Sequence, residues 1–221
     1  MSKITLIWLI VGLFLIIYSV IAGLFGPVPD LPVLRQSIRM LYFHVPMWFS
    51  MTFLHLITTV FAVQYLRTGD ERWASQLPHF LKVALWAGII GIITGMIWAN
   101  STWGAPWHND PKQNAAAATL LMLVGFFILW RSLPYTNRYR IASVYVIISF
   151  IMSVALIFVF PRLTDSLHPG AGGNPGFNVY DLDGKMRLVF YPAVIGWLIL
   201  TYLFAKWDWL ISQKIKQHGK V

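Results

Sequence analysis

The stretch ITLIWLIVGLFLIIYSVIAGLF, residues 4–25, decides the fold class, because it carries no charged side chain and is long enough to cross a bilayer. A helix rises about 1.5 Å per residue, so roughly 20 apolar residues span a hydrocarbon core of about 30 Å. The whole chain has a similar character, since 57% of its residues are hydrophobic and 11% are charged. A soluble domain of this composition would expose too much apolar surface. The solvent of this chain is therefore mostly lipid.

Five further apolar stretches follow the first. We expect transmembrane helices at residues 4–25, 40–66, 81–99, 115–130, 141–160 and 188–205. Lys3 precedes an apolar run longer than that of a signal peptide, and no A-x-A cleavage pattern follows, so the first helix is expected to be retained. The predicted fold is an all-α membrane protein, with residues 1–221 forming a single domain that is a bundle of six transmembrane helices.

The charged residues predict how the bundle is oriented. One side of the membrane would carry 11 of the 17 Lys and Arg residues and three of the eight acidic residues, and the other side would carry six and five. The positive-inside rule then places both termini in the cytoplasm and the three odd-numbered loops outside. The cations are spread along short loops without forming a basic domain, so the net charge of +9 indicates topology and not a nucleic-acid partner.

The first outer loop begins with prolines and becomes helix-like from Val33 onward. Leu34, Ile38 and Leu41 are spaced for one helix face, while Arg35 and Arg39 share another. This pattern predicts a short helix lying in the membrane interface, where Arg35 binds either lipid headgroups or a ligand.

Two features lie within the predicted membrane helices. Gly91 and Gly95 form a G-x-x-x-G pair, which we interpret as a site of close helix packing. His55 lies eleven residues after His44, on nearly the same face and about 16 Å deeper. We expect it to be a neutral histidine hydrogen-bonded between helices, with a ligand for heme in transit as the alternative.

The three outer loops together provide the side chains of a site for a planar cofactor. They contribute His44 in LYFHVP, Trp103 and Trp107 in WGAPWHND, and His168 in SLHPG. Heme iron takes two imidazoles as axial ligands, its ring packs against indoles, and its propionates bind cations. The cations available on this side are Arg35, Arg39, Lys112 and Arg162. The chain has no cysteine, so heme would be bound without a covalent bond, as heme b.

These segments carry a family resemblance. WGAPWHND resembles the tryptophan-rich WGxxWxWD (WWD) signature of heme-handling cytochrome c assembly proteins, and RMLYFHVP resembles the R-x-x-Y-x-H-V-P segment of the heme exporter protein C family. The resemblance implies that His44 and His168 are the axial ligands and that Trp103, Gly104, Trp107 and Asp110 form the heme platform. Arg39 matches the family's arginine. Asn109 departs from the signature, which has tryptophan there, and His108 beside it is given no role.

The resemblance also implies a function. A protein of this family would bind heme at the periplasmic face of a bacterial inner membrane and present it to a membrane-tethered heme chaperone, beside ABC-type transporter subunits. It would be a carrier and not an enzyme, with a chaperone histidine displacing one axial ligand.

Two other functions remain open from the sequence. A cytochrome c synthase of the other bacterial assembly system shares the tryptophan-rich motif and would attach heme to a C-x-x-C-H peptide, although such proteins are generally longer. A b-type cytochrome or non-heme transporter subunit would instead use His55 within the bilayer.

Overall fold

The computed structural model describes residues 2–31, 34–160, 163–168 and 182–218, and within these ranges the regular structure is helical. Among the described residues, six helices are long and apolar enough to cross a membrane. In chain order the elements are α1 (Lys3–Phe25), the 3₁₀ helix η1 (Arg35–Met40), α2 (Leu41–Thr68), the short α3 (Glu71–Ala74), α4 (Leu77–Trp103), α5 (Pro111–Ser132), α6 (Tyr135–Val154), the π-helical turn η2 (Ala155–Val159) and α7 (Gly184–His218). The predicted all-α architecture is confirmed.

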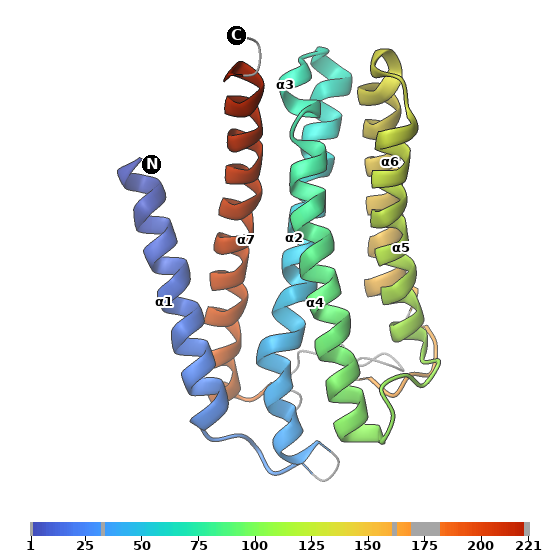
Figure 1. Cartoon of the computed structure of the whole chain (residues 1–221). Helices are drawn as coiled ribbons and strands as arrows, with labels where there is room; N and C mark the ends of the chain where they lie inside the picture. Colours follow the sequence, from blue (N-terminus) through green and yellow to red (C-terminus); the bar gives the residue numbers. More distant parts are fainter. Residues whose placement is uncertain (1, 32–33, 161–162, 169–181, 219–221) are drawn as a thin grey trace.

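The six long helices run roughly alongside one another, with the connections gathered at two ends (Figure 1). The α2–α4 connection that contains α3 and the α5–α6 turn lie at the end toward which both chain termini point. The α1–α2 and α4–α5 loops lie at the opposite end, as does the start of α7. This arrangement brings the loops that carry the predicted site to one end of the bundle.

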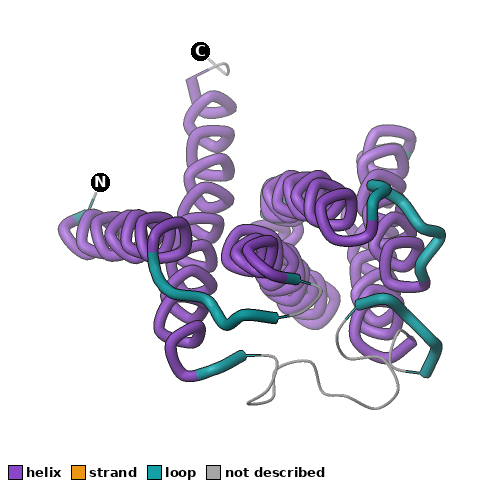
Figure 2. Tube along the Cα trace, turned by 90° about the horizontal axis from the view of Figure 1, so that it is seen from below, coloured by secondary structure: helices purple, strands orange, loops and turns teal. Residues whose placement is uncertain are grey.

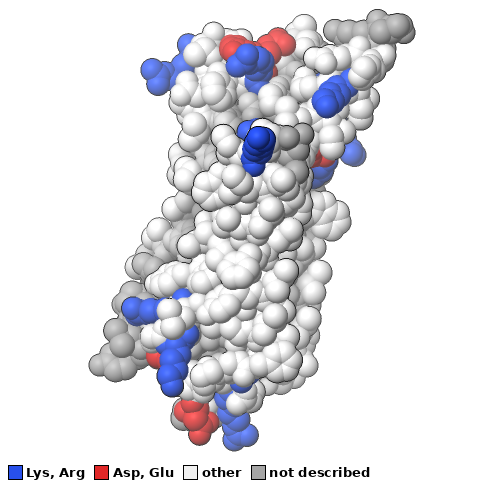
Figure 3. Space-filling model, turned by 90° about the vertical axis from the view of Figure 1, so that its left-hand side faces the viewer, with Lys and Arg blue, Asp and Glu red and all other residues white. Residues whose placement is uncertain are grey.

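The surface is consistent with a lipid environment. On the face shown in Figure 3, charged side chains gather toward the two ends and uncharged surface lies between them. Large apolar side chains of α1 point outward, among them Phe14 and Phe25 at 67% and 82% exposure. Apolar exposure of this extent along a helix is what lipid contact requires. The chain is therefore a multi-pass membrane protein.

Two apolar clusters hold the bundle together. The larger one is built mainly by α2, α4, α5 and α6, with Phe80, Leu123 and Phe126 at its centre. The smaller one lies near the loop end and joins η1 and α2 to the start of α7 through Ile38, Tyr42 and Phe190. Seen along the bundle in Figure 2, α1 lies beside α7 at the edge of the assembly. The helix α1 thus packs mainly on α7, outside the larger cluster.

The first outer loop differs in detail from the prediction. The expected helical segment is present, but it is a 3₁₀ helix that begins at Arg35 and passes directly into α2 at Leu41. Ser37 Oγ stabilises its first turn by donating to the carbonyl oxygen of Leu34 (2.6 Å). Arg35 adopts a positive φ of 43°, a strained conformation for a residue with a long side chain. Whether this segment lies along a membrane surface stays a prediction.

Candidate functional site

The loop end of the bundle contains a cavity lined by both of the predicted ligand histidines. His44 reaches it from α2 and His168 from the loop before α7. Trp48, Gly95, Met96, Trp107, Lys112 and Gln113 also line it, together with Ile92, Ala116 and Ile157. The cavity volume is about 130 Å³, which is smaller than that of a typical small-molecule pocket (about 300–1,000 Å³), and the cavity is partly open to the outside. The structure therefore brings together two imidazoles that are more than a hundred residues apart in sequence.

The hydrogen bonds of His44 define its tautomer. Its Nδ1 lies 2.9 Å from the carbonyl oxygen of Gly91 and 3.3 Å from Thr94 Oγ1. A carbonyl oxygen only accepts hydrogen bonds, so the Nδ1 of a neutral His44 must carry the proton. The lone pair of the imidazole is then on Nε2. Two indoles meet the ring edge-on, Trp98 at 5.8 Å and Trp48 at 6.2 Å between centroids.

His168 is oriented by a carboxylate. Its Nδ1 lies 3.0 Å from Asp110 Oδ1 and therefore donates to it, which again places the lone pair of the neutral ring on Nε2. Asp110 also accepts hydrogen bonds from the backbone N–H of Leu167 (2.8 Å) and the hydroxyl of Ser166 (2.9 Å). Histidines that bind metals commonly donate their other ring N–H to a carboxylate in this way. Asp110 thus fixes both the position of the loop and the orientation of its imidazole.

The local electrostatics favour a neutral His168 and an ionised Asp110. Burial lowers the pKa of His168 below its ordinary value, although the neighbouring Asp110 opposes this, so the ring is neutral at pH 7. Burial of the Asp110 carboxyl works against its charge, but hydrogen bonds from Leu167 and Ser166 and the proximity of His168 outweigh burial, so that the pKa of Asp110 is lowered. A neutral imidazole beside a carboxylate is the form that binds a metal.

The tryptophan-rich segment forms a tight turn between α4 and α5. Gly104 ends α4 with a φ of +84°, a left-handed conformation that glycine adopts without steric cost. Asp110 caps α5 by accepting from the backbone N–H of Lys112, and Pro111 occupies the first helical turn. Gln113 holds the turn between these helices, because its Oε1 accepts from the backbone N–H of His108 and its Nε2 donates to the carbonyl of Pro106.

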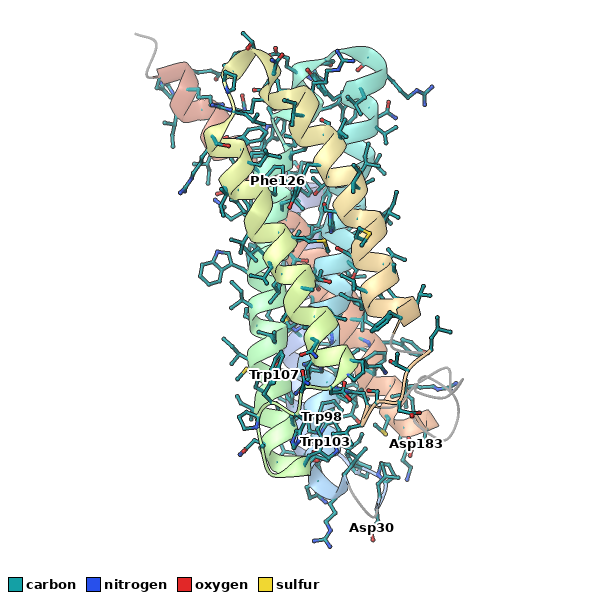
Figure 4. All side chains as sticks on the ribbon, turned by 90° about the vertical axis from the view of Figure 1, so that its right-hand side faces the viewer. Asp30, Trp98, Trp103, Trp107, Phe126 and Asp183 are labelled. Carbon is teal, nitrogen blue, oxygen red and sulfur yellow. The ribbon has the colours of Figure 1, made fainter. Side chains whose placement is uncertain are left out.

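The indoles of this segment occupy different places. Trp103 meets the His168 ring edge-on at 4.9 Å between centroids, and Trp107 lines the cavity while remaining 37% exposed. Figure 4 shows Trp98, Trp103 and Trp107 toward the loop end of the bundle, with Phe126 in the opposite half. Trp103 therefore supports the His168 ring, while Trp107 is placed to contact whatever fills the cavity.

Asn109 and His108, which follow Trp107, make contacts within the same turn. Asn109, where the signature has tryptophan, adopts a φ of 55°, which asparagine tolerates better than a bulky residue. Its Oδ1 accepts from Asn114 Nδ2 at 2.8 Å, so it stabilises the turn that precedes Asp110. His108 packs edge-on against Trp103, and its Nε2 is buried without a hydrogen-bond partner among the described residues.

The predicted cations are separated in the structure. Lys112 lines the cavity. Arg39 belongs to η1, and its side chain reaches the end of α1. There its guanidinium donates to the carbonyl oxygens of Gly23 (2.9 Å) and Gly26 (2.7 Å). Arg39 therefore ties η1 to α1, and a contact with a propionate in this cavity would require a different side-chain position. Arg162 lies outside the described residues.

Sequence comparison assigns the chain to a family. It matches the family described as Cytochrome C assembly protein over residues 1–168, about three quarters of its length. The chain belongs to this family. This assignment supports a role in cytochrome c biogenesis.

Matches to individual proteins are more local. Cytochrome c biogenesis protein CcsA of Thermosynechococcus vestitus is 49% identical over 37 residues, which are 17% of this chain and 12% of that protein. The protein of the same name from Oenothera argillicola is 38% identical over 52 residues, 24% of this chain and 15% of the relative. Heme exporter protein C of Paracoccus denitrificans is 24% identical over 96 residues, 43% of this chain and 40% of the relative. The chain thus aligns with less than half the length of each of these relatives.

Several residues of this assembly protein's site were not predicted from sequence. Trp48 and Trp98 contact His44, and Ser166 holds the Asp110 carboxylate. Ser37 accepts from the indole N–H of Trp98 at 3.3 Å and so connects η1 to the His44 environment. Periodicity gives no signal for these residues, because each acts through a contact between different elements.

His55 belongs to the interior of the bundle. It is fully buried, and its Nε2 lies 3.1 Å from Ser149 Oγ on α6. Its Nδ1 has no hydrogen-bond partner among the described residues. The expected hydrogen bond between helices is confirmed, and His55 is not among the residues that line the cavity.

Proposed function

We propose that this protein binds heme b non-covalently in the cavity at the loop end of the bundle and presents it, at the periplasmic face of the inner membrane, to a membrane-tethered heme chaperone. The observation that carries the proposal is the pair of imidazoles in one cavity, each with Nδ1 donating to a fixed acceptor and with its Nε2 lone pair available. Iron is the metal that takes two such ligands while the porphyrin packs against indoles.

The chemistry of the lining residues suits this cargo, and the cavity of about 130 Å³ would widen to take it. Trp107 offers an indole face at the cavity, and Lys112 offers a cation for a propionate. The lining also includes apolar side chains, Ile92 and Ile157 among them, which suit the hydrocarbon edge of a porphyrin. Because the chain has no cysteine, nothing in it forms a thioether bond to heme, and the cargo remains exchangeable.

Handover would depend on the two histidines being mounted differently. His44 belongs to a transmembrane helix, whereas His168 lies on a loop held through the carboxylate of Asp110. An incoming imidazole from a chaperone needs to replace only one of them. We propose that the His168 side gives way first, because among the described residues His168 and its neighbours are held by hydrogen bonds to Asp110, whereas His44 belongs to a long packed helix.

Transfer to a chaperone distinguishes this function from the synthase alternative. Detergent-purified protein loaded with heme is mixed either with an immobilised heme-chaperone domain or with a peptide containing C-x-x-C-H. We expect heme to move to the chaperone domain and the peptide to gain no covalently attached heme. Covalent attachment to the peptide without transfer to the chaperone would contradict the proposal and support a synthase. ABC-type transporter subunits are the further partners that we propose for the assembly.

A further inference from the structure

The His44 imidazole lies directly against α4 at two glycines. Its Nδ1 donates to the carbonyl oxygen of Gly91, and its ring covers Gly95 one turn later. A Cβ atom at Gly95 would lie 2.6 Å from His44 Cε1 and 3.1 Å from Nδ1. A Cβ at Gly91 would lie 3.0 Å from Cε2 of the Trp48 indole. The imidazole and an indole that contacts it therefore occupy space that any larger residue of α4 would fill.

We infer that Gly91 and Gly95 are positioning residues for His44, and we call this pair the glycine socket. Gly95 provides the space in which the ring lies, and Gly91 provides both space for Trp48 and the carbonyl that holds the proton on Nδ1. Together they fix the direction and the tautomer of the ring, so that the Nε2 lone pair is available at the cavity. This inference rests on the proposed function, because it assigns the socket a role in iron ligation.

The socket explains a motif that the sequence assigned to helix packing alone. A G-x-x-x-G pair allows two helix backbones to approach, and α2 does pack closely on α4 here. The side chains that use the space are nevertheless His44 and Trp48. Gly88, one turn earlier on α4, shows the contrasting case, since a Cβ there would meet Leu120 Cδ2 at 2.4 Å and Met51 Sδ at 2.9 Å. Gly88 thus serves apolar packing, and it offers a matched control.

A double-mutant cycle tests the socket without any heme. Gly95→Ala should lower the Tm of the detergent-purified apoprotein by roughly 3–10 °C, because overpacking strains the His44 ring. In a His44→Ala background the same substitution should lower Tm by less than half as much, because the ring is no longer there to clash. Gly88→Ala should lower Tm equally in both backgrounds. An undiminished effect of Gly95→Ala in the His44→Ala background would overturn the inference.

The heme-loaded protein gives the second measurement. Gly95→Ala should convert at least half of the heme from the six-coordinate low-spin to the five-coordinate high-spin form, and millimolar imidazole should restore the low-spin spectrum. Gly88→Ala should keep the wild-type spin state. If Gly95→Ala does not accumulate as folded protein, the Gly95→Ala, His44→Ala double variant should accumulate, and its failure to do so would contradict the socket.

The proposed function and the socket fail in distinguishable ways. A wild-type protein without a bis-imidazole spectrum would refute the ligand assignment itself. A wild-type protein with that spectrum, accompanied by a folded Gly95→Ala variant that keeps it unchanged, would refute only the positioning role of the glycine socket.

Discussion

The two sides of the cavity present the same imidazole in different ways. His44 lies on a transmembrane helix, surrounded by Trp48, Trp98 and the α4 backbone, and a backbone carbonyl orients it. His168 lies on a loop, and a carboxylate orients it. The helix side is determined by packing along two long elements, whereas the loop side depends on hydrogen bonds that converge on one residue. If the protein carries heme as proposed, the helix would provide a rigid ligand and the loop a releasable one.

Replacement of Asp110 should have the largest effect, because it removes the acceptor of His168 and of the backbone that carries it. We expect Asp110→Ala to speed heme dissociation by about 10- to 100-fold, the usual effect of losing the group that orients a metal ligand. The measurement is transfer of heme to excess apomyoglobin, followed by stopped-flow absorbance.

Two control variants separate the roles of Asp110. Asp70→Ala removes a comparable helix cap, which accepts from the backbone N–H of Arg72 at the other end of the bundle, and should leave heme dissociation unchanged. Asp110→Asn removes the charge at nearly constant shape, and it should raise the heme midpoint potential because the anionic partner of the imidazole is lost. Equal dissociation rates in Asp110→Ala and wild type would show that the loop is held by other contacts.

Trp103 beside His168 should slow heme dissociation more than Trp98 beside His44 does. Trp103→Leu should speed heme dissociation by roughly three- to tenfold, since an aromatic pair contributes about 0.5–1.5 kcal/mol and Trp103 packs edge-on against the His168 ring. Trp98→Leu should change the rate by less than about twofold, because His44 keeps its hydrogen bond to Gly91 and its contact with Trp48. If Trp98→Leu speeds heme dissociation more than Trp103→Leu does, His44 and not His168 is the more weakly held histidine.

Single hydroxyl groups should show the same asymmetry on a smaller scale. Ser166 both donates to Asp110 and accepts from the backbone N–H of His168, so Ser166→Ala should speed dissociation by up to about fivefold, equivalent to about 1 kcal/mol. Thr94→Val should have almost no effect, because the Gly91 carbonyl remains the closer acceptor for His44. Titration of both variants with hemin, followed by dissociation in parallel, compares them directly. A stronger effect of Thr94→Val would mean that the hydroxyl sets the tautomer of His44.

Much of the fold could be predicted because the length and hydropathy of a single stretch of sequence are enough to identify a membrane-spanning helix. Each apolar stretch lies on one helix, and the odd-numbered loops meet at one end. The common location of His44 and His168 followed from the same argument. Residues 169–181, in the longest outer loop, lie outside the described residues.

The supporting contacts could not be predicted, because they join elements that are distant in sequence. The hydrogen bonds of Asp110 with residues 166–168 and the contact of Gly95 with His44 have no periodic signature. Arg39 matched a family motif, but in the structure its guanidinium caps α1, because the carbonyl oxygens of Gly23 and Gly26 at the helix end are within reach. The family motif thus identified Arg39 but did not predict which groups its guanidinium contacts.

The smallest effect on heme is expected from His55, which is buried in the bundle and hydrogen-bonded to Ser149. His55→Ala should lower thermal stability and leave the heme spectrum unchanged. Loss of heme from this variant, with retention in His44→Ala, would favour the b-type cytochrome alternative.

We propose that His44 and His168 hold one heme iron between them. Absorption and electron paramagnetic resonance spectra of the detergent-purified, heme-loaded wild type, His44→Ala and His168→Ala test it most directly. We expect a low-spin bis-imidazole spectrum in the wild type and its loss in each variant, with recovery when imidazole is added. A wild-type spectrum in both variants would contradict it.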